Sequence, residues 1–113
     1  METKKMTYMQ AVRLALDAAF GRDEQVIMMG QDIGILGGAY GVTGDLYQKY
    51  GPGRGIDAPR AENAIVGVGI GTAMTGWRPI IDIMKMDFSL VCVDPIVNHL
   101  AKYRYMSGGQ IKS

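Results

Sequence analysis

The chain has 113 residues, enough for one domain, and its formal net charge of +1 comes without any basic run, which argues against capture of nucleic acid. Cys92 is the only cysteine, so an intrachain disulfide is excluded and a reducing compartment is favoured. Residues 1–6 do not resemble a signal peptide, and the longest apolar run, residues 64–77, is too short to span a bilayer. We therefore expect a cytoplasmic protein with no membrane partner, or a protein of the mitochondrial matrix if a transit peptide has been removed.

Apolar periodicity and turn residues predict alternating helices and strands. In chain order we expect a helix over 7–22, a strand over 25–30, a helix over 43–50, a strand over 55–57, a helix over 61–75, a strand over 79–84 and a helix over 88–103. Thr7 and Gln10 match a capping box, Gly21 and Gly76 are natural helix stops, and Asp87 is the expected N-cap of the last helix. This alternation predicts a three-layer α/β/α fold around a mainly parallel sheet whose strands are covered on both faces.

Three glycines lie inside the expected helix over residues 61–75, where each costs about 1 kcal/mol relative to alanine. Gly67, Gly69 and Gly71 fit a dinucleotide-binding fingerprint poorly, because Thr72 takes its third glycine position and the glycines lie within the helix. Gly67 and Gly71 share a helical face with Ala64. A face without side chains predicts close contact with another helix, either in a tight core or between subunits.

Glu62 begins the same helix and is the candidate residue for acid/base chemistry. An acidic residue in the first helical turn also complements the helix macrodipole without any further role, so its position alone leaves both interpretations open. The single histidine, His99, is more typical of a packed or solvated residue than of a catalytic base. Asp82, Asp87 and Asp94 are scattered around a strand end and a helix start, and no spacing typical of a metal site occurs.

Many short stretches, in order along nearly the whole chain, match one family. They are Met6-Thr-Tyr8, Gly30-Gln-Asp32-Ile-Gly34, Gly37-Gly-Ala-Tyr40-Gly-Val-Thr43, Ile56-Asp-Ala-Pro59, residues 62–71, Thr75-Gly-Trp-Arg78-Pro79, Met86-Asp-Phe88, Asp94-Pro-Ile-Val-Asn98 and residues 101–109. They resemble the start of the β subunit of the E1 component of thiamine-diphosphate-dependent 2-oxoacid dehydrogenase complexes, whose relatives include acetoin dehydrogenase. The resemblance implies that residues 1–113 are the N-terminal part of a transketolase-like pyrimidine-binding domain.

The resemblance also implies roles for two residues. The acid at the Glu62 position of the family hydrogen-bonds N1′ of the cofactor's aminopyrimidine and favours the imino tautomer, which takes the proton from thiazolium C2. The spacing from Glu62 to Gly67 and Gly71 matches the family's pattern. The aromatic residue at the Phe88 position packs on the pyrimidine ring. The glycine helix is expected to contact a second β subunit through Gly67 and Gly71.

On this resemblance the chain contributes to oxidative decarboxylation of a 2-oxoacid together with an E1 α subunit, which carries the Mg²⁺ and diphosphate ligands, and with the E2 acyltransferase. The choice among pyruvate, branched-chain 2-oxoacids and acetoin stays open. The 113-residue chain alone is expected to be inactive, to lack strong thiamine diphosphate binding, and either to self-associate or to need the rest of its subunit. The alternative is a non-catalytic, truncated interaction or oligomerisation module.

Two positions depart from the family. Gln31 stands where the family usually has glutamate, and Val91 where it commonly has glutamine or glutamate. Both positions lie on a polar path that links two active sites in related enzymes. Because Glu62 and Asp94 are retained, the resemblance implies that cofactor activation is preserved, whereas proton communication between sites is called into question.

Overall fold

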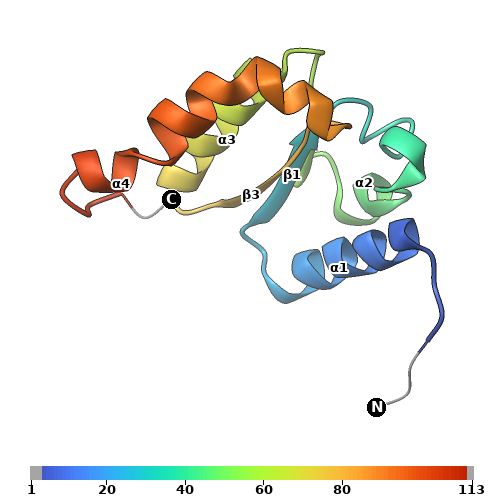
Figure 1. Ribbon diagram of the computed structural model, residues 1–113. Helices are drawn as coiled ribbons and strands as arrows, with labels where there is room; N and C mark the ends of the chain where they lie inside the picture. Colours follow the sequence, from blue (N-terminus) through green and yellow to red (C-terminus); the bar gives the residue numbers. More distant parts are fainter. Residues whose placement is uncertain (1–3, 112–113) are drawn as a thin grey trace.

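The computed structural model describes residues 4–111, which form a parallel sheet with helices on both faces (Figure 1). The sheet has the order β2-β1-β3, with strands β1 (Val26–Gly30), β2 (Gly55–Asp57) and β3 (Arg78–Asp82). Met28 of the central strand lies opposite Gly55 of β2 and Ile80 of β3. The predicted α/β class and the parallel sheet are confirmed.

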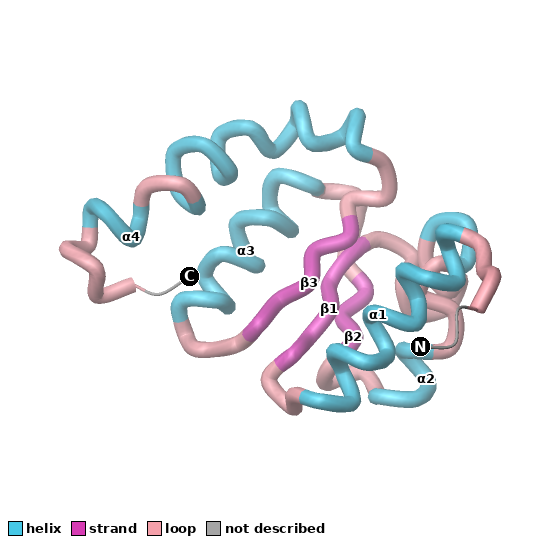
Figure 2. The backbone as a smooth tube through the Cα atoms, turned by 60° about the horizontal axis from the view of Figure 1, so that its bottom comes forward, coloured by secondary structure: helices cyan, strands magenta, loops and turns pink. Residues whose placement is uncertain are grey.

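Helices cover both faces of this small sheet. Helices α1 (Tyr8–Arg22) and α2 (Leu46–Tyr50) lie on one side, and α3 (Glu62–Met74) lies on the other (Figure 2). A short 3₁₀ turn, η1 (Ala39–Gly41), precedes α2. Double coverage explains why β1 is an uninterrupted apolar run that is buried at every position.

The core is divided by the sheet because successive strand side chains point to opposite faces. Val26 and Met28 pack with Phe20 of α1 on one face. Ile27 and Met29 belong to a second cluster with Ile65 of α3 on the other face. These contacts fix α3 on the sheet, and with it the residue at which the helix begins.

Arg54 joins the start of β2 to the turn between α1 and β1. Its Nε donates to the Val26 carbonyl at 2.9 Å, and its Nη2 donates to the carbonyls of Phe20 at 3.0 Å and Asp23 at 2.6 Å. The guanidinium also lies over the rings of Phe20, 4.8 Å from the centroid, and Tyr50, at 5.2 Å. One planar side chain therefore satisfies three backbone carbonyls and covers two aromatic rings.

The ends of α1 confirm one sequence expectation and correct another. Thr7 and Gln10 form the predicted capping box: the Gln10 amide donates to Thr7 Oγ1 at 3.2 Å, and the Thr7 amide donates to Gln10 Oε1 at 2.9 Å. Gly21 does not stop the helix, which continues through Arg22 to an extended Asp23. Arg22 holds this last turn, because its Nε donates to the Ala18 carbonyl at 3.0 Å.

The prediction of one continuous helix over residues 88–103 is wrong. The segment consists of three pieces: the 3₁₀ helix η2 (Met86–Cys92), the π-helical turn η3 (Pro95–Leu100) and the short helix α4 (Tyr103–Met106). Pro95 has no N–H to donate to the carbonyl four residues earlier, which interrupts a regular α-helix here. The N-cap of the first piece is Lys85, so the prediction of Asp87 as N-cap is also wrong.

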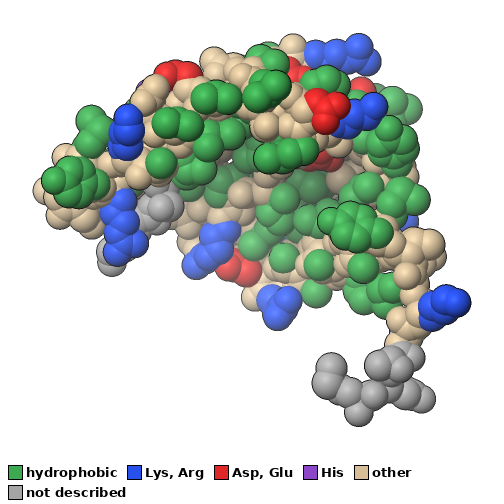
Figure 3. Space-filling view, viewed as in Figure 1, with side chains coloured by type: hydrophobic (Ala, Val, Ile, Leu, Met, Phe, Trp, Pro, Cys, Tyr) green, Lys and Arg blue, Asp and Glu red, His purple; other side chains and the backbone are tan. Residues whose placement is uncertain are grey.

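Apolar side chains also remain on the surface. Among the large ones, Ile35 is 89% exposed and Leu90 and Met86 are each 78% exposed. Figure 3 shows hydrophobic groups spread over much of one face of the molecule. Extended apolar surface of this kind is typical of sites that contact other protein. Within residues 4–111, no helix has both the length and the apolar character needed to cross a membrane.

Candidate functional site

The three parallel strands end at one edge of the sheet, and this edge carries the candidate site. Gln31 directly follows β1, Glu62 begins α3 after β2, and Asp82 is the last residue of β3. In open parallel α/β sheets, ligands bind outside the carboxyl ends of the strands. The sheet thus brings polar residues that are distant in sequence to the edge where ligands are expected.

Glu62 and Gln31 are joined directly. Gln31 Nε2 donates to Glu62 Oε1 at 2.9 Å. Gln31 is buried, with 2% of its surface exposed, whereas Glu62 is only partly buried. The carboxylate therefore has one side fixed against a buried amide while it stays accessible to a ligand.

The surroundings favour the ionised form of Glu62. The pKa of its carboxyl group is held below the ordinary value, first by a hydrogen bond from its own backbone N–H at the start of α3 and then by the Gln31 amide. The positive charge of Arg60 acts in the same direction, and partial desolvation opposes it. Glu62 is therefore ionised at neutral pH and accepts hydrogen bonds from a bound group.

The end of β3 approaches β1 closely because Gly30 has no side chain. A Cβ at Gly30 would lie 2.6 Å from the Asp82 carbonyl oxygen, which no real contact allows. Beyond this point Asp82 Oδ1 accepts a hydrogen bond from the Met84 amide at 2.7 Å, and Met84 adopts a φ of 67°. This turn redirects the chain from β3 into η2, the segment that carries Phe88.

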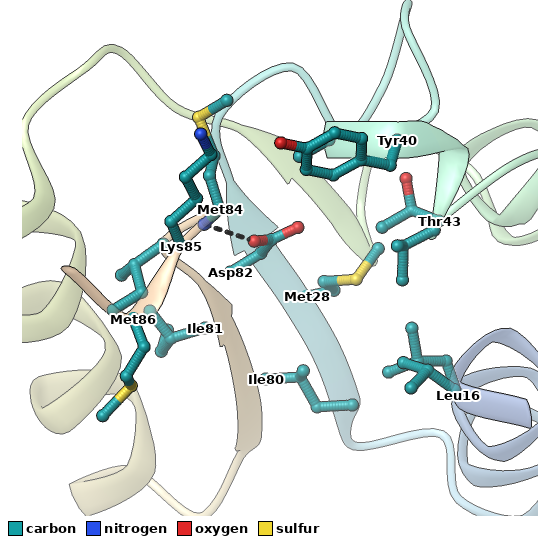
Figure 4. Close-up of a pocket in the computed structure, with 14 residues that line it drawn as sticks. Leu16, Met28, Tyr40, Thr43, Ile80, Ile81, Asp82, Met84, Lys85 and Met86 are labelled. Atoms are coloured by element: carbon teal, nitrogen blue, oxygen red, sulfur yellow. Dashed lines mark hydrogen bonds between the residues drawn. The ribbon is translucent and has the colours of Figure 1, made fainter. Parts of the chain in front are cut away.

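A pocket of about 310 Å³ opens beside this turn, on the α1 side of the sheet. Figure 4 shows the Asp82 carboxylate among its lining side chains, with Tyr40 and Thr43 from the loop after β1 and with Met84 and Lys85 from the turn after β3. The rest of the lining is mostly apolar and includes Leu16, Met28 and Ile80. Neither Glu62 nor Phe88 lines this pocket.

Phe88 lies in η2, which packs against α3. Its side chain is 36% exposed, and its backbone is fixed at both sides: its amide donates to the Lys85 carbonyl at 3.0 Å, and its carbonyl accepts from Cys92 Sγ at 3.4 Å. Cys92 itself is fully buried. The Phe88 ring is thus partly open to solvent. Its segment, η2, follows β3 at the edge of the sheet where Glu62 also lies.

The three glycines of α3 serve different faces. Gly67 and Gly71 are exposed, and a Cβ at either would meet no atom within 4 Å. Ala64 and Val68, nearby on the helix, are exposed as well. We call the exposed set of Ala64, Gly67 and Gly71 the glycine stripe. Nothing within the described chain packs on Gly67 or Gly71, so the predicted contact with another helix stays a prediction, whereas Gly69 faces Ile81 of β3.

A groove of about 440 Å³ runs beside the glycine stripe. Gly67, Gly71 and Met74 line one side, and the stacked rings of His99 and Tyr103, 5.1 Å apart, line the other. His99 therefore packs against Tyr103 in the wall of this groove, which is consistent with a packed residue, one of the two roles expected from the sequence. Among residues 4–111, no group of three or more His, Cys, Asp or Glu side chains is placed to hold a metal ion.

Sequence reasoning singled out Gln31 only as a departure from a family, and missed its contact with Glu62. A signal for the contact exists, because Gln31 follows one buried strand and Glu62 follows the neighbouring strand, so both lie at one edge of a parallel sheet. It also missed Asp82 as the residue that organises the turn after β3. No sequence signal pointed to Arg54.

Comparisons with known proteins identify the domain family. Residues 4–113 match the family described as transketolase, pyrimidine binding domain. The chain is 44% identical over 109 residues to the pyruvate dehydrogenase E1 component subunit beta, mitochondrial, of Dictyostelium discoideum, covering 96% of this chain and 31% of that protein. It is 48% identical over 100 residues to the corresponding subunit beta of Cyanidium caldarium, covering 88% and 31%.

A bacterial relative gives the same result. The chain is 42% identical over 110 residues to the pyruvate dehydrogenase E1 component subunit beta of Rhizobium meliloti, covering 97% of this chain and 24% of that protein. The chain therefore spans a third or less of the length of these relatives. The match to the domain family, in contrast, extends over nearly all of this chain. This chain belongs to the family of transketolase pyrimidine-binding domains.

Proposed function

We propose that this chain is the N-terminal part of the pyrimidine-binding domain in the β subunit of a thiamine-diphosphate-dependent E1 enzyme, with pyruvate as the 2-oxoacid. The observation that carries the proposal is the ionised Glu62 carboxylate at the start of α3, bonded to a buried amide at the ligand-binding edge of a parallel sheet. The choice of pyruvate rests on the names of the three relatives reported above, which are pyruvate dehydrogenase subunits.

The side chains at this edge offer groups of the kind that an aminopyrimidine ring requires. Bound thiamine diphosphate would supply the electron sink for decarboxylation of the 2-oxoacid. Glu62, as an anionic acceptor, is suited to hold and return a proton at ring nitrogen N1′. Phe88, exposed over about a third of its surface, offers an aromatic face for the ring to pack on. Gln31 keeps the Glu62 side chain in place.

The proposed assembly has several chains. We propose an E1 α subunit that supplies the Mg²⁺ and diphosphate ligands, a second β subunit that packs on the glycine stripe, and the E2 acyltransferase of the complex. The open stripe, the exposed apolar side chains and the length of the relatives support these partners. The cytoplasm, or the mitochondrial matrix, is the proposed location, supported by relatives that include bacterial and mitochondrial proteins.

The decisive experiment replaces Glu62 in a reconstituted α/β enzyme. We expect Glu62→Gln to lower pyruvate turnover at least about 100-fold, the usual loss when acid/base help is removed. Glu24→Gln is the matched control, because Glu24 is exposed and precedes β1 at the opposite edge of the sheet. Light scattering checks that both variants still assemble. Near-normal turnover of an assembled Glu62→Gln enzyme would contradict the proposed function.

A further inference from the structure

We propose that Gln31 is a positioning residue that holds the Glu62 side chain in one orientation and keeps it in its anionic form. What Glu62 then does rests on the proposed function, but the pairing itself is a property of this chain. Gln31 would then act on Glu62, and would not merely occupy space after β1.

The geometry of Gln31 is strongly constrained. It follows directly after Gly30, the last residue of the buried central strand, so its backbone is fixed by the sheet. Its side chain is almost fully buried, with 2% exposed, and Nε2 lies 2.9 Å from Glu62 Oε1. A buried amide that left this bond unmade would carry the full cost of its desolvation, about 1–3 kcal/mol. The Gln31 donor therefore stays directed at Glu62.

The chemistry of the pair runs in one direction. An ionised carboxylate only accepts hydrogen bonds, so the nitrogen of the Gln31 amide, and not its oxygen, must face Glu62. The amide does not titrate in the physiological range, so it stabilises the charge on Glu62 without relaying a proton. The Gln31 amide occupies one acceptor site of the Glu62 carboxylate, and the other acceptor sites remain available to a donor on a ligand.

Other charges at this edge define what a change at position 31 would do. Arg60 is the cation whose charge acts on Glu62. The other charged side chains on the elements and loops at this edge are four aspartates and one lysine: Asp32, Asp57, Asp82, Asp87 and Lys85. A carboxylate at position 31 would add a like charge within hydrogen-bond distance of Glu62, and one of two such groups titrates at a raised pH.

The test uses the full-length β chain assembled with its α partner, in three variants. Gln31→Glu adds a carboxylate, the near-isosteric Gln31→Met removes the donor and keeps the volume, and Gln48→Glu is the control at an exposed glutamine of α2. The first readout is an infrared titration of the Glu62 carboxyl band without cofactor, assigned by subtracting the Glu62→Gln spectrum. The second is the pH profile of kcat/KM, which reports ionisations of the free enzyme.

We expect Gln31→Glu to shift the Glu62 titration upward by about one pH unit or more, and the acidic limb of the kcat/KM profile to move with it. Gln31→Met should shift both in the same direction by less, and Gln48→Glu should shift neither. If the Glu62 titration does not move in either Gln31 variant, the proposal is overturned. If it moves but Glu62→Gln keeps full turnover, the proposed function fails while the positioning of Glu62 by Gln31 stands.

Discussion

Gly69 of α3 lies directly against Ile81 of β3: a Cβ on Gly69 would be 2.5 Å from Ile81 Cδ1 and 2.9 Å from Cγ1. Gly69 is buried, whereas Gly67 and Gly71 on the same helix are exposed and open. One helix thus uses glycine for two purposes. Gly69 brings α3 down onto the sheet, which places Glu62 at the carboxyl edge, and the glycine stripe leaves the outer face free.

The contact between Gly69 and Ile81 predicts a specific loss of stability. Gly69→Val should lower the free energy of unfolding by about 1–3 kcal/mol, because the added side chain must displace Ile81 from a packed core. Urea denaturation measures the effect. Ala15→Val, at an exposed position of α1, is the control and should cost only a few tenths of a kcal/mol through the lower helix propensity of valine. Equal losses at the two sites would show that Gly69 is not packed as described.

The glycine stripe predicts a defect in association and not in folding. A Cβ added at Gly67 would meet no atom of its own chain within 4 Å, so the secondary structure of Gly67→Leu, measured by circular dichroism, should be unchanged. If a second β subunit approaches the stripe, the leucine side chain would block it, and the mass measured by light scattering should fall. Ala15→Leu adds similar bulk to an exposed face of α1 and should leave the mass unchanged. A Gly67→Leu protein that assembles normally would rule out the stripe as the contact.

Arg54 is predicted to be irreplaceable by lysine. Arg54→Lys keeps the charge but loses the planar fork that bonds the carbonyls of Val26, Phe20 and Asp23. We expect a loss of about 2 kcal/mol or more in unfolding free energy, because hydrogen bonds to charged groups contribute about 1.5–3 kcal/mol each and backbone carbonyls are left without a donor. Arg104→Lys, at an exposed position of α4, should be close to neutral. Similar denaturation midpoints for the two variants would contradict this role.

Stability should fall in acid because of specific carboxylates. The pKa of Asp17 is lowered first by its hydrogen bond from Lys49, 2.6 Å away, and then by the Tyr50 hydroxyl; the pKa of Asp45 is lowered by Arg13. A depressed folded-state pKa means that the stabilisation is present above the unfolded value, near about 4, and is lost as the pH falls through the folded value. Urea midpoints measured between pH 7 and pH 2 should therefore decline in this range.

Asp17→Asn separates this effect from general acid sensitivity. The variant should show a flatter decline below about pH 4 than the unmodified protein, because one of the groups with a depressed pKa is gone. The exposed Glu24→Gln variant should keep the original slope. An unchanged slope in Asp17→Asn would show that the contact of Asp17 with Lys49 and Tyr50 does not contribute to folding.

The sequence by itself determined several local features of this protein. Thr7 and Gln10 define a capping box through contacts three residues apart, and the strand over residues 55–57 and the helix that Glu62 begins are set by short-range signals. The alternation of strands and helices was enough to predict a parallel sheet covered on both faces. The resemblance to a family was carried by short stretches spread over nearly the whole chain.

The tertiary structure alone decided which of similar residues have which role. Helical spacing already puts Gly67 and Gly71 on one face of the helix, but only the packing of α3 on β3 decides that this face is open and that Gly69 is the buried glycine. Likewise the Gln31 amide reaches Glu62 only because neighbouring parallel strands end at the same edge. Such contacts join residues far apart along the chain, where local propensity carries no information and the register of the sheet sets the distance.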